Sequence, residues 1–390
     1  MSDLVGRQHW DIFCTVVDNY GDIGVTWRLA KQLQQEFAIE VRLWVDDLHS
    51  FAHILPSLEP TSTVQQQQGV SIIHWQSPLP ITWQAGAVLI EAFACQLPNE
   101  VLDTLTQLSK DAIKWLNLEY LSAEDWVESC HGLPSIQPSG HKKYFYFPGF
   151  NANTGGLICE RALLTEREHW QQNNQRQRYF QALGLTDIAD DDIVLSVFCY
   201  ESPALTALCA YWQQAPQAPQ ALHLLIPKGR CLTSLASLLP APVEQYSAGE
   251  RIQLGKLTVH ILPMTDQAGY DRLLWSCDLN IVRGEDSFVR AQWSAKPFVW
   301  HIYPQQENAH LVKLDAFLSR YCDNLAPNIA RIWSDFNLAF NQDDENQVVT
   351  LWQQLTSVIL PLANHSLNWQ NAVLADADLA TRLVKFVEKI

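Results

Sequence analysis

The feature that most constrains the fold is a regular alternation of short apolar, β-branched runs with longer runs of helical spacing. In the first half, the strand-like runs are residues 11–17, 40–45, 70–75, 87–93, 113–119 and 143–147, and the helical runs are 24–37, 48–55 and 99–109. The Gln65–Gln68 run is predicted to be a polar loop. Strands that alternate with helices indicate parallel β-α-β units.

The alternation starts again after a polar, low-complexity stretch at residues 171–178. The later strand-like runs are 193–199, 221–227, 257–262, 279–282 and 297–301, and the helical runs are 204–212, 232–239, 270–277 and 286–294. An amphipathic pattern over roughly 368–389 ends the chain. The sequence therefore predicts an α/β protein with two Rossmann-like domains facing a cleft, at 1–170 and 191–365, joined by a linker at 171–190.

Charge and cysteine content exclude some classes of function. The net charge of −16 argues against non-specific binding to nucleic acid or to an anionic membrane. No apolar stretch is long enough to cross a membrane, and no signal peptide is evident. The nine cysteines include no C-x-x-C pair. We expect reduced core thiols and a cytoplasmic protein.

Ligands of such sheets bind at the carboxyl ends of strands, so the strand-to-helix turns are the first places to search. The first turn carries Asp18, Asn19, Tyr20, Gly21 and Asp22, and it lacks a dinucleotide-binding glycine pattern. In one interpretation, Asp22 caps the helix and Asp18 holds the turn. In the other, both carboxylates face the cleft and one of them acts as a base.

A second turn of the same kind runs through Arg283, Glu285, Asp286 and Ser287. A helix N-terminus offers amide donors to an anion, and Arg283 and Ser287 add a cation and a hydroxyl. Glu285 would repel phosphate, but it suits hydroxyl groups of a sugar or ribose. The alternative is that Asp286 or Ser287 only caps the helix.

Weaker candidates follow other predicted strands. Phe198 and Tyr200 end a strand and are candidates for stacking on a base or sugar, although core packing is the commoner role of aromatic residues. Pro263 and Gln267 follow another strand, where a nucleobase often lies in such folds. The glycine-rich turn at 153–156 either shapes the cleft or receives an acceptor, or it is an ordinary loop.

No metal site is predicted. Asp376 and Asp378 form a D-x-D pattern within a helical stretch, which favours a solvated helix face. His49 and His53 have helical spacing but no third ligand. Residues 190–192 are three aspartates that are interpreted as a solvated turn.

The motifs resemble the EarP family, the protein-arginine rhamnosyltransferases of bacterial elongation factor P. The resemblance lies in DIFCTVVDNYGDIGVTWRLA from Asp11, LNLEYLSAE from Leu116, FPGF from Phe147, RGEDSFVRAQW from Arg283 and QENAHL from Gln306, and it extends over essentially the whole chain. It implies a GT-B fold and inverting transfer of L-rhamnose from dTDP-β-L-rhamnose. The implied acceptor is one arginine of elongation factor P, and no cofactor or metal is implied.

The resemblance also implies roles for the candidate residues. Asp22 matches the general base and Asp18 its essential neighbour, with Asn19, Tyr20 and Gly21 on the acceptor side. The implied donor-binding residues are Phe198, Tyr200, Pro263, Gln267, Arg283, Glu285, Asp286 and Ser287, with Glu285 also counted as catalytic. The C-terminal helix, 366–390, would return to the N-terminal domain.

Elementary chemistry is consistent with this reaction. Arginine has a pKa above about 12 and a delocalised lone pair, so it is a poor nucleophile. Two carboxylates would orient one guanidinium nitrogen and take up its proton. Two alternatives stay open from the residues alone. One is a GT-B transferase with another nucleotide-sugar or a small-molecule acceptor, and the other is a non-catalytic nucleotide-sugar-binding protein.

Overall fold

The computed structural model describes residues 9–18, 20–172, 175–214 and 220–390. It divides into two compact units. The N-terminal unit ends at Arg161 and includes the returning segment Val373–Ile390, and the C-terminal unit is Ala162–Ala372. Residues 171–190, expected as a linker, contain the end of one helix and all of the next. Among the described residues, no helix is long and apolar enough to cross a membrane.

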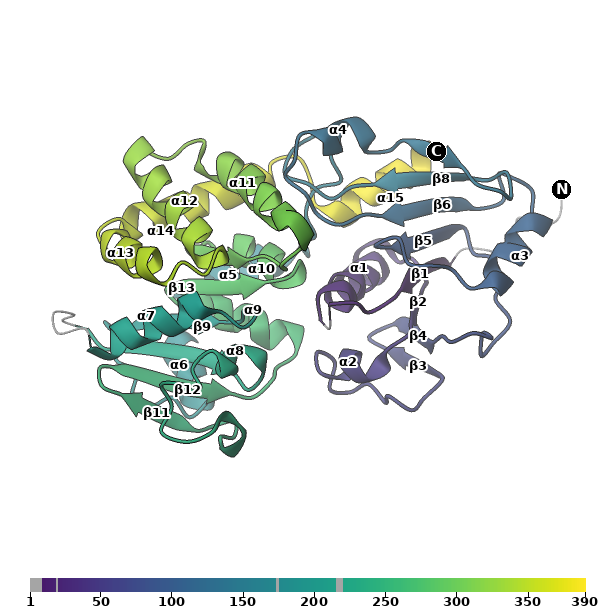
Figure 1. The fold of residues 1–390 in the computed structure, drawn as a ribbon. Helices are drawn as coiled ribbons and strands as arrows, with labels where there is room; N and C mark the ends of the chain where they lie inside the picture. The colour runs from purple at the N-terminus through teal and green to yellow at the C-terminus, as the bar shows by residue number, and fades with distance from the viewer. Residues whose placement is uncertain (1–8, 19, 173–174, 215–219) are drawn as a thin grey trace. The chain divides into compact units, whose positions relative to one another are not determined.

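The N-terminal unit is built on an eight-stranded sheet in the order β3-β4-β2-β1-β5-β6-β8-β7, parallel except at its two edge strands (Figure 1). Its strands are β1 (Trp10–Cys14), β2 (Val41–Val45), β3 (Val64–Gln67), β4 (Val70–His74), β5 (Val88–Ala92), β6 (Lys114–Leu118), β7 (Pro134–Ile136) and β8 (Lys142–Tyr146). Its helices are α1 (Gly21–Phe37), α2 (Leu48–Ala52), α3 (Asn99–Gln107), α4 (Trp126–Cys130) and α15 (Leu379–Lys389).

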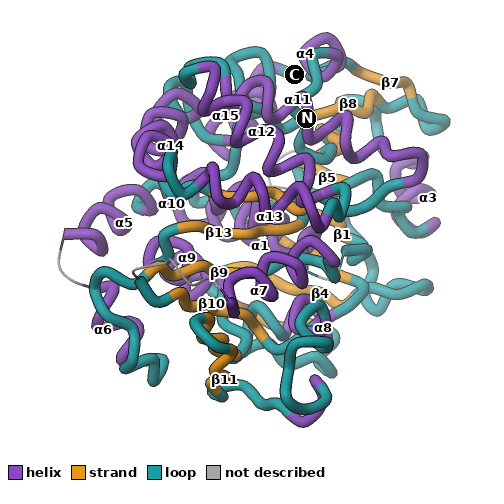
Figure 2. The backbone as a smooth tube through the Cα atoms, turned by 60° about the vertical axis from the view of Figure 1, so that its left-hand side comes forward, coloured by secondary structure: helices purple, strands orange, loops and turns teal. Residues whose placement is uncertain are grey.

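The C-terminal unit has a six-stranded sheet in the order β11-β12-β10-β9-β13-β14, parallel except at β11. Figure 2 shows β13, β9 and β10 side by side. The strands are β9 (Ile193–Val197), β10 (Leu222–Pro227), β11 (Arg251–Leu254), β12 (Leu257–Leu262), β13 (Leu279–Arg283) and β14 (Phe298–His301). The helices are α5 (Leu163–Gln172), α6 (Gln175–Ala182), α7 (Pro203–Gln214), α8 (Arg230–Thr233), α9 (Gln267–Ser276), α10 (Asp286–Ser294), α11 (Ala309–Cys322), α12 (Pro327–Asn341), α13 (Glu345–Leu355) and α14 (Ile359–Val373).

The predicted fold class is confirmed, since both units are parallel α/β sheets with helices in the crossovers. The prediction that the Gln65–Gln68 run is a loop is wrong. Residues 64–67 form edge strand β3, which pairs antiparallel with β4 through a turn at Gln68 and Gly69. Both turn residues have positive φ, at 50° and 86°, as a tight hairpin requires. An edge strand can consist of polar side chains, so the glutamine run gave no alternating apolar pattern from which β3 could be predicted.

The C-terminal helix α15 packs on the N-terminal unit, whereas residues 366–372 of the expected returning segment belong to the C-terminal unit. Phe386 of α15 lies against the rings of Tyr144 and Tyr146, with ring centroids 5.8 and 5.5 Å away. Arg382 donates to the carbonyl oxygens of Asn151 and Thr154 at 2.6 and 2.9 Å, so the glycine-rich turn is fastened to this helix. The helical pattern of 368–389 is interrupted between α14 and α15, where Asp378 caps α15 by accepting from the Thr381 amide.

Candidate functional site

The loop after β1 places a buried carboxylate at the start of α1. Asp22 is 2% exposed, and its Oδ2 accepts from the amides of Val17 and Asp18 at 2.8 and 2.9 Å. These amides precede the helix, so Asp22 braces the loop. It is not the N-cap, which is Tyr20, and that residue makes no side-chain capping bond. Asn19 lies outside the described residues.

The second oxygen of Asp22 faces a tyrosine from another strand end. Tyr120, just beyond β6, donates its hydroxyl to Asp22 Oδ1 at 3.2 Å. The Tyr120 ring is 41% exposed and stacks on Phe93, at the carboxyl end of β5, with centroids 4.5 Å apart. Burial raises the pKa of Asp22 above its ordinary value, and its hydrogen bonds oppose part of that rise. A carboxylate with a raised pKa is better matched to taking up a proton.

Carboxylates gather at this edge of the N-terminal sheet. Asp18 and Asp22 follow β1, Asp46 follows β2 and Glu119 follows β6, and these strands lie within four neighbouring positions of the sheet. Burial raises the pKa of Asp46 and of Glu119. Gly21 packs closely against this group, since a Cβ there would lie 3.3 Å from Asp18 Oδ2 and would require a small shift of that side chain. The edge is therefore acidic and partly desolvated, and a cation bound there would stabilise the charged form of these carboxylates.

The C-terminal unit brings its predicted residues to the carboxyl ends of β9, β12 and β13. The Arg283 guanidinium lies over the rings of Phe198 and Tyr200, at 4.4 and 4.9 Å from the ring centroids. Arg283 is 8% exposed and also donates to the Cys199 carbonyl at 3.4 Å. A guanidinium next to aromatic rings suits a ligand that carries both a phosphate, which the guanidinium can bind, and a flat ring, which the aromatic side chains can stack on.

The turn into α10 is held by Ser287. The amide of Arg283 donates to Ser287 Oγ at 3.0 Å, and the Ser287 hydroxyl donates to the Arg283 carbonyl. Gly284 has φ of +60°, which lets the chain reverse between β13 and α10. Glu285 and Asp286, both half-buried, occupy the N-cap and first position of the helix. The hydroxyl of Ser287 thus holds the turn between β13 and α10.

The remaining predicted donor residues lie at the end of β12. Pro263 is exposed, and Gln267 is 5% exposed as the first residue of α9. The edge of the Phe198 ring meets Tyr270 of the same helix, with centroids 5.7 Å apart. The ends of β9, β12 and β13 therefore share one edge of the sheet, and the predicted donor residues lie along it.

Sequence reasoning missed residues at two strand ends. Glu119 and Tyr120 follow β6, and His301 and Tyr303 lie at the end of β14. The centroid of the Tyr200 ring lies 5.4 Å from the ring centroids of both His301 and Tyr303. The buried Nδ1 of His301 has no hydrogen-bond partner among the described residues. Burial lowers the pKa of His301 to about 3, and the nearby Arg283 contributes, so the ring is neutral. A search of the sequence at the carboxyl end of every predicted strand would have found these four residues.

The residues that the sequence analysis rejected as metal ligands either have structural contacts or lie exposed. Asp378 caps α15, and Asp376 lies 3.7 Å from Arg382. His49 and His53 are exposed on and just after α2. All nine cysteines are free thiols, and seven are buried. The expectation of reduced core thiols is consistent with this pattern.

Comparison with known proteins gives this arrangement a family. Residues 10–388 match the family model described as elongation factor P (EF-P) rhamnosyltransferase EarP. The chain is 59% identical to a protein-arginine rhamnosyltransferase of Shewanella oneidensis, with full coverage of both chains. It is 46% identical to one of Pseudomonas putida, covering 97% of this chain and 98% of that one.

Solved structures agree. A structure described as the basis for EarP-mediated arginine glycosylation of EF-P superposes with a TM-score of 0.67 at 32% identity, covering 98% of this chain and 99% of that one. A glycosyltransferase from Rickettsia africae, at 9% identity and a TM-score of 0.54 with 98% of each chain covered, shares the fold alone. The two Rossmann-like units are thus those of a GT-B glycosyltransferase, and the chain belongs to the EarP family of protein-arginine rhamnosyltransferases.

Proposed function

We propose that this enzyme transfers L-rhamnose from dTDP-β-L-rhamnose to one arginine of elongation factor P, with inversion at the sugar carbon. The observation that carries the proposal is the acidic edge of the N-terminal sheet, where Asp18 and buried Asp22 lie on one loop. A guanidinium is the protein group that best fits paired carboxylates, because its N–H groups match their oxygens. We take elongation factor P as the acceptor because the matching family and the related solved structure are described as acting on EF-P.

In this mechanism, Asp22 takes up the proton of the attacking nitrogen at Oδ1, while Asp18 orients the guanidinium. The nitrogen forms a bond to C1 of rhamnose as the bond from C1 to the diphosphate oxygen breaks. A single displacement converts the β-linked donor into an α-linked product. Tyr120 holds Asp22 in place through its hydrogen bond of 3.2 Å. Tyr20 and Gly21 shape the acceptor side of this loop.

The donor would lie at the carboxyl edge of the C-terminal sheet. The N-terminal amides of α10 and the charge of Arg283 stabilise the diphosphate as it leaves. Glu285 accepts hydrogen bonds from sugar hydroxyls, and Asp286 and Ser287 fix the turn that presents these groups. Phe198, Tyr200, Pro263 and Gln267 surround the nucleoside. Because protein groups neutralise the leaving group here, we propose that transfer requires no metal and no cofactor.

The reaction would take place in the cytoplasm, where elongation factor P functions in translation. The nine free thiols are consistent with a reducing compartment. With a net charge of −16, the enzyme would bind neither nucleic acid nor an anionic membrane surface without a local basic patch.

Intact mass spectrometry tests the proposal directly. Purified elongation factor P is incubated with the enzyme and dTDP-rhamnose, and its mass should rise by one deoxyhexose residue. Replacing the acceptor arginine of elongation factor P with lysine is the matched control and should abolish the shift. No shift with an enzyme that still binds dTDP-rhamnose would exclude this acceptor. It would leave a transferase with another acceptor.

A further inference from the structure

Two buried histidines meet on neighbouring strands of the C-terminal sheet, away from the proposed donor residues. His223 of β10 and His260 of β12 are each 2% exposed. Nδ1 of His223 lies 2.9 Å from Nε2 of His260. In the parallel register, His223 pairs with Thr258, so both histidines project from the same face of the sheet.

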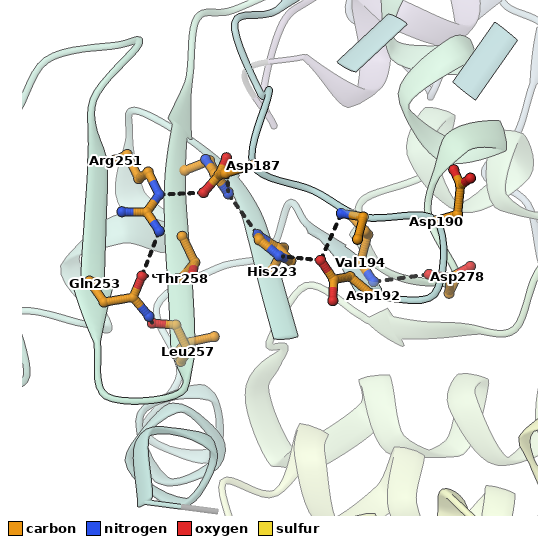
Figure 3. Close-up of polar contacts among 12 residues, drawn as sticks. Asp187, Asp190, Asp192, Val194, His223, Arg251, Gln253, Leu257, Thr258 and Asp278 are labelled. Atoms are coloured by element: carbon orange, nitrogen blue, oxygen red, sulfur yellow. Dashed lines mark hydrogen bonds and ion pairs between the residues drawn. The ribbon is translucent and has the colours of Figure 1, made fainter. Parts of the chain in front are cut away.

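Carboxylates complete the cluster on both sides. Asp187 Oδ1 lies 4.0 Å from Nε2 of His260, and Asp192 Oδ2 lies 3.1 Å from Nε2 of His223. Arg251 bonds the other oxygen of Asp187, which leaves Oδ1 facing the rings. Figure 3 shows Arg251, Asp187, His223 and Asp192 along one line of polar side chains. Asp192 was expected in a solvated turn, but it also serves as the partner of a buried histidine.

We propose that Asp187, His223 and His260 bind a Zn²⁺ ion, with Asp192 as the positioning residue for His223. One ligand atom from each of the three lies within 4.8 Å of the other two. Ligands of a tetrahedral Zn²⁺ with bonds of about 2.0–2.1 Å lie roughly 3.3 Å apart. Nε2 of His260 lies 2.9 Å from Nδ1 of His223 and 4.0 Å from Oδ1 of Asp187, one distance below this value and one above it. Small side-chain shifts would therefore bring the three atoms to the spacing of Zn²⁺ ligands.

The protonation states suit a metal. Because Nε2 of His223 donates to Asp192, its Nδ1 carries a lone pair directed at His260. A carboxylate behind a ligating histidine is the usual arrangement in zinc sites. On binding, the His260 proton moves from Nε2 to Nδ1, and water fills the fourth position beside exposed Asp187.

The role of this ion would be structural. It would join β10, β12 and the segment between α6 and β9, which shares a core with them through Leu225, Ile188 and Leu262. Asp192 precedes β9, and Phe198 follows it, so the two residues are separated by roughly 20 Å of extended chain. The transfer chemistry at the carboxyl ends therefore does not need the ion.

The experiment uses the full chain, stripped with EDTA and then freed of chelator. ZnCl₂ is titrated against a chromophoric competitor, and the melting temperature is recorded with and without Zn²⁺. We expect one bound Zn²⁺ per chain and a higher melting temperature. Asp187→Asn, at an exposed position, should weaken binding by at least about tenfold. Asp190→Asn changes an exposed aspartate of the same turn and should leave binding unchanged.

Cobalt distinguishes this site from a thiol site. Co²⁺ bound to the wild-type chain should give visible absorption of a four-coordinate nitrogen and oxygen set, without the intense near-ultraviolet bands of thiolate ligation. Thiolate bands would overturn the assignment. Absence of saturable binding to the wild-type chain, or equal affinity of the two aspartate variants, would also overturn it. Circular dichroism of both variants establishes that they are folded.

Discussion

Asp22 is the side chain on which the proposed reaction most depends, because it is buried and its two oxygens have different partners. Oδ2 is occupied by two backbone amides, which fix the orientation of the group. Among the described residues, Oδ1 accepts a hydrogen bond from the hydroxyl of Tyr120, so it retains a lone pair for a proton. Asp22 therefore braces the loop instead of capping α1, and bracing the loop is compatible with the proposed role as the base.

Asp22→Asn should reduce transfer by about 10²–10⁴-fold, because the amide keeps the shape of the group but cannot take up a proton. The affinity for dTDP-rhamnose should not change, since the proposed donor residues belong to the other unit. Calorimetric titration and single-turnover transfer separate the two effects. Glu285→Ala gives the contrast, with weaker donor binding. Near-normal turnover of Asp22→Asn would leave this residue a purely structural role.

Tyr120→Phe should shift the pH dependence of transfer. The acid limb of kcat/KM follows deprotonation of Asp22, whose pKa burial has already raised. The hydroxyl of Tyr120 stabilises the charged form and lowers that pKa, so its removal should raise the pKa further and move the acid limb to higher pH. Circular dichroism and dTDP-rhamnose affinity serve as controls. A uniform loss of rate with an unmoved limb would show that Tyr120 acts on something else.

The residues that the sequence pointed to are those that follow strongly apolar strands. Asp22 and Arg283 could be singled out because each lies at the junction of a clear strand and a clear helix, Asp22 in the first turn of α1 and Arg283 at the end of β13. The pairing of His223 with His260 was not predictable, since the histidines are far apart in sequence and meet only because β10 and β12 are neighbours in the sheet. Strand order is a property of the folded chain, and spacing in the sequence does not reveal it.

At the level of elements, the parallel strands were predictable and the antiparallel edges were not. β3, β7 and β11 each pair antiparallel at the edge of a sheet, and each is only three or four residues long. An edge strand is held by one neighbour's backbone, so it carries little hydrophobic signal. The predicted helix over 232–239 is shorter than expected, since α8 ends at Thr233 and turns follow.

A buried ion pair fixes the two helices that begin at the donor edge. Arg290 of α10 is 1% exposed and bonds both oxygens of Asp271 of α9 at 2.8 Å. These helices start at Asp286 and Gln267. Arg290→Met should cost roughly 3–5 kcal/mol of unfolding free energy, because it leaves a buried carboxylate without its partner.

Urea unfolding measures that loss, and the double variant Asp271→Leu with Arg290→Met is the matched control. Replacing both partners removes the uncompensated charge, so the double variant should recover most of the stability. A single variant that loses less than about 1 kcal/mol would mean that solvent reaches Asp271 and screens it.

At the scale of the whole molecule, we expect removal of metal to lower the melting temperature without changing the rate of transfer. Transfer should proceed at the same rate in EDTA, since α10 amides and Arg283 are proposed to stabilise the leaving diphosphate. The melting temperature should fall in EDTA if the chain was purified with Zn²⁺ bound to His223 and His260. Both are measured on one preparation, and Asp187→Asn should be insensitive to EDTA in both assays. Loss of transfer in EDTA that Mg²⁺ restores would contradict the metal-independent mechanism.

The acceptor should be a folded protein domain and not a linear peptide. Attack at C1 requires one guanidinium nitrogen to be placed within about an ångström, and a preformed loop loses less conformational entropy on docking than a peptide does. With its net charge of −16, the enzyme should also attract a basic surface around the target arginine. Transfer to elongation factor P should therefore slow with added salt mainly through a higher apparent KM for the acceptor, while the KM for dTDP-rhamnose serves as the internal control. Equal kcat/KM for the domain and for a peptide with the same arginine would refute docking, because only the domain presents that loop already folded.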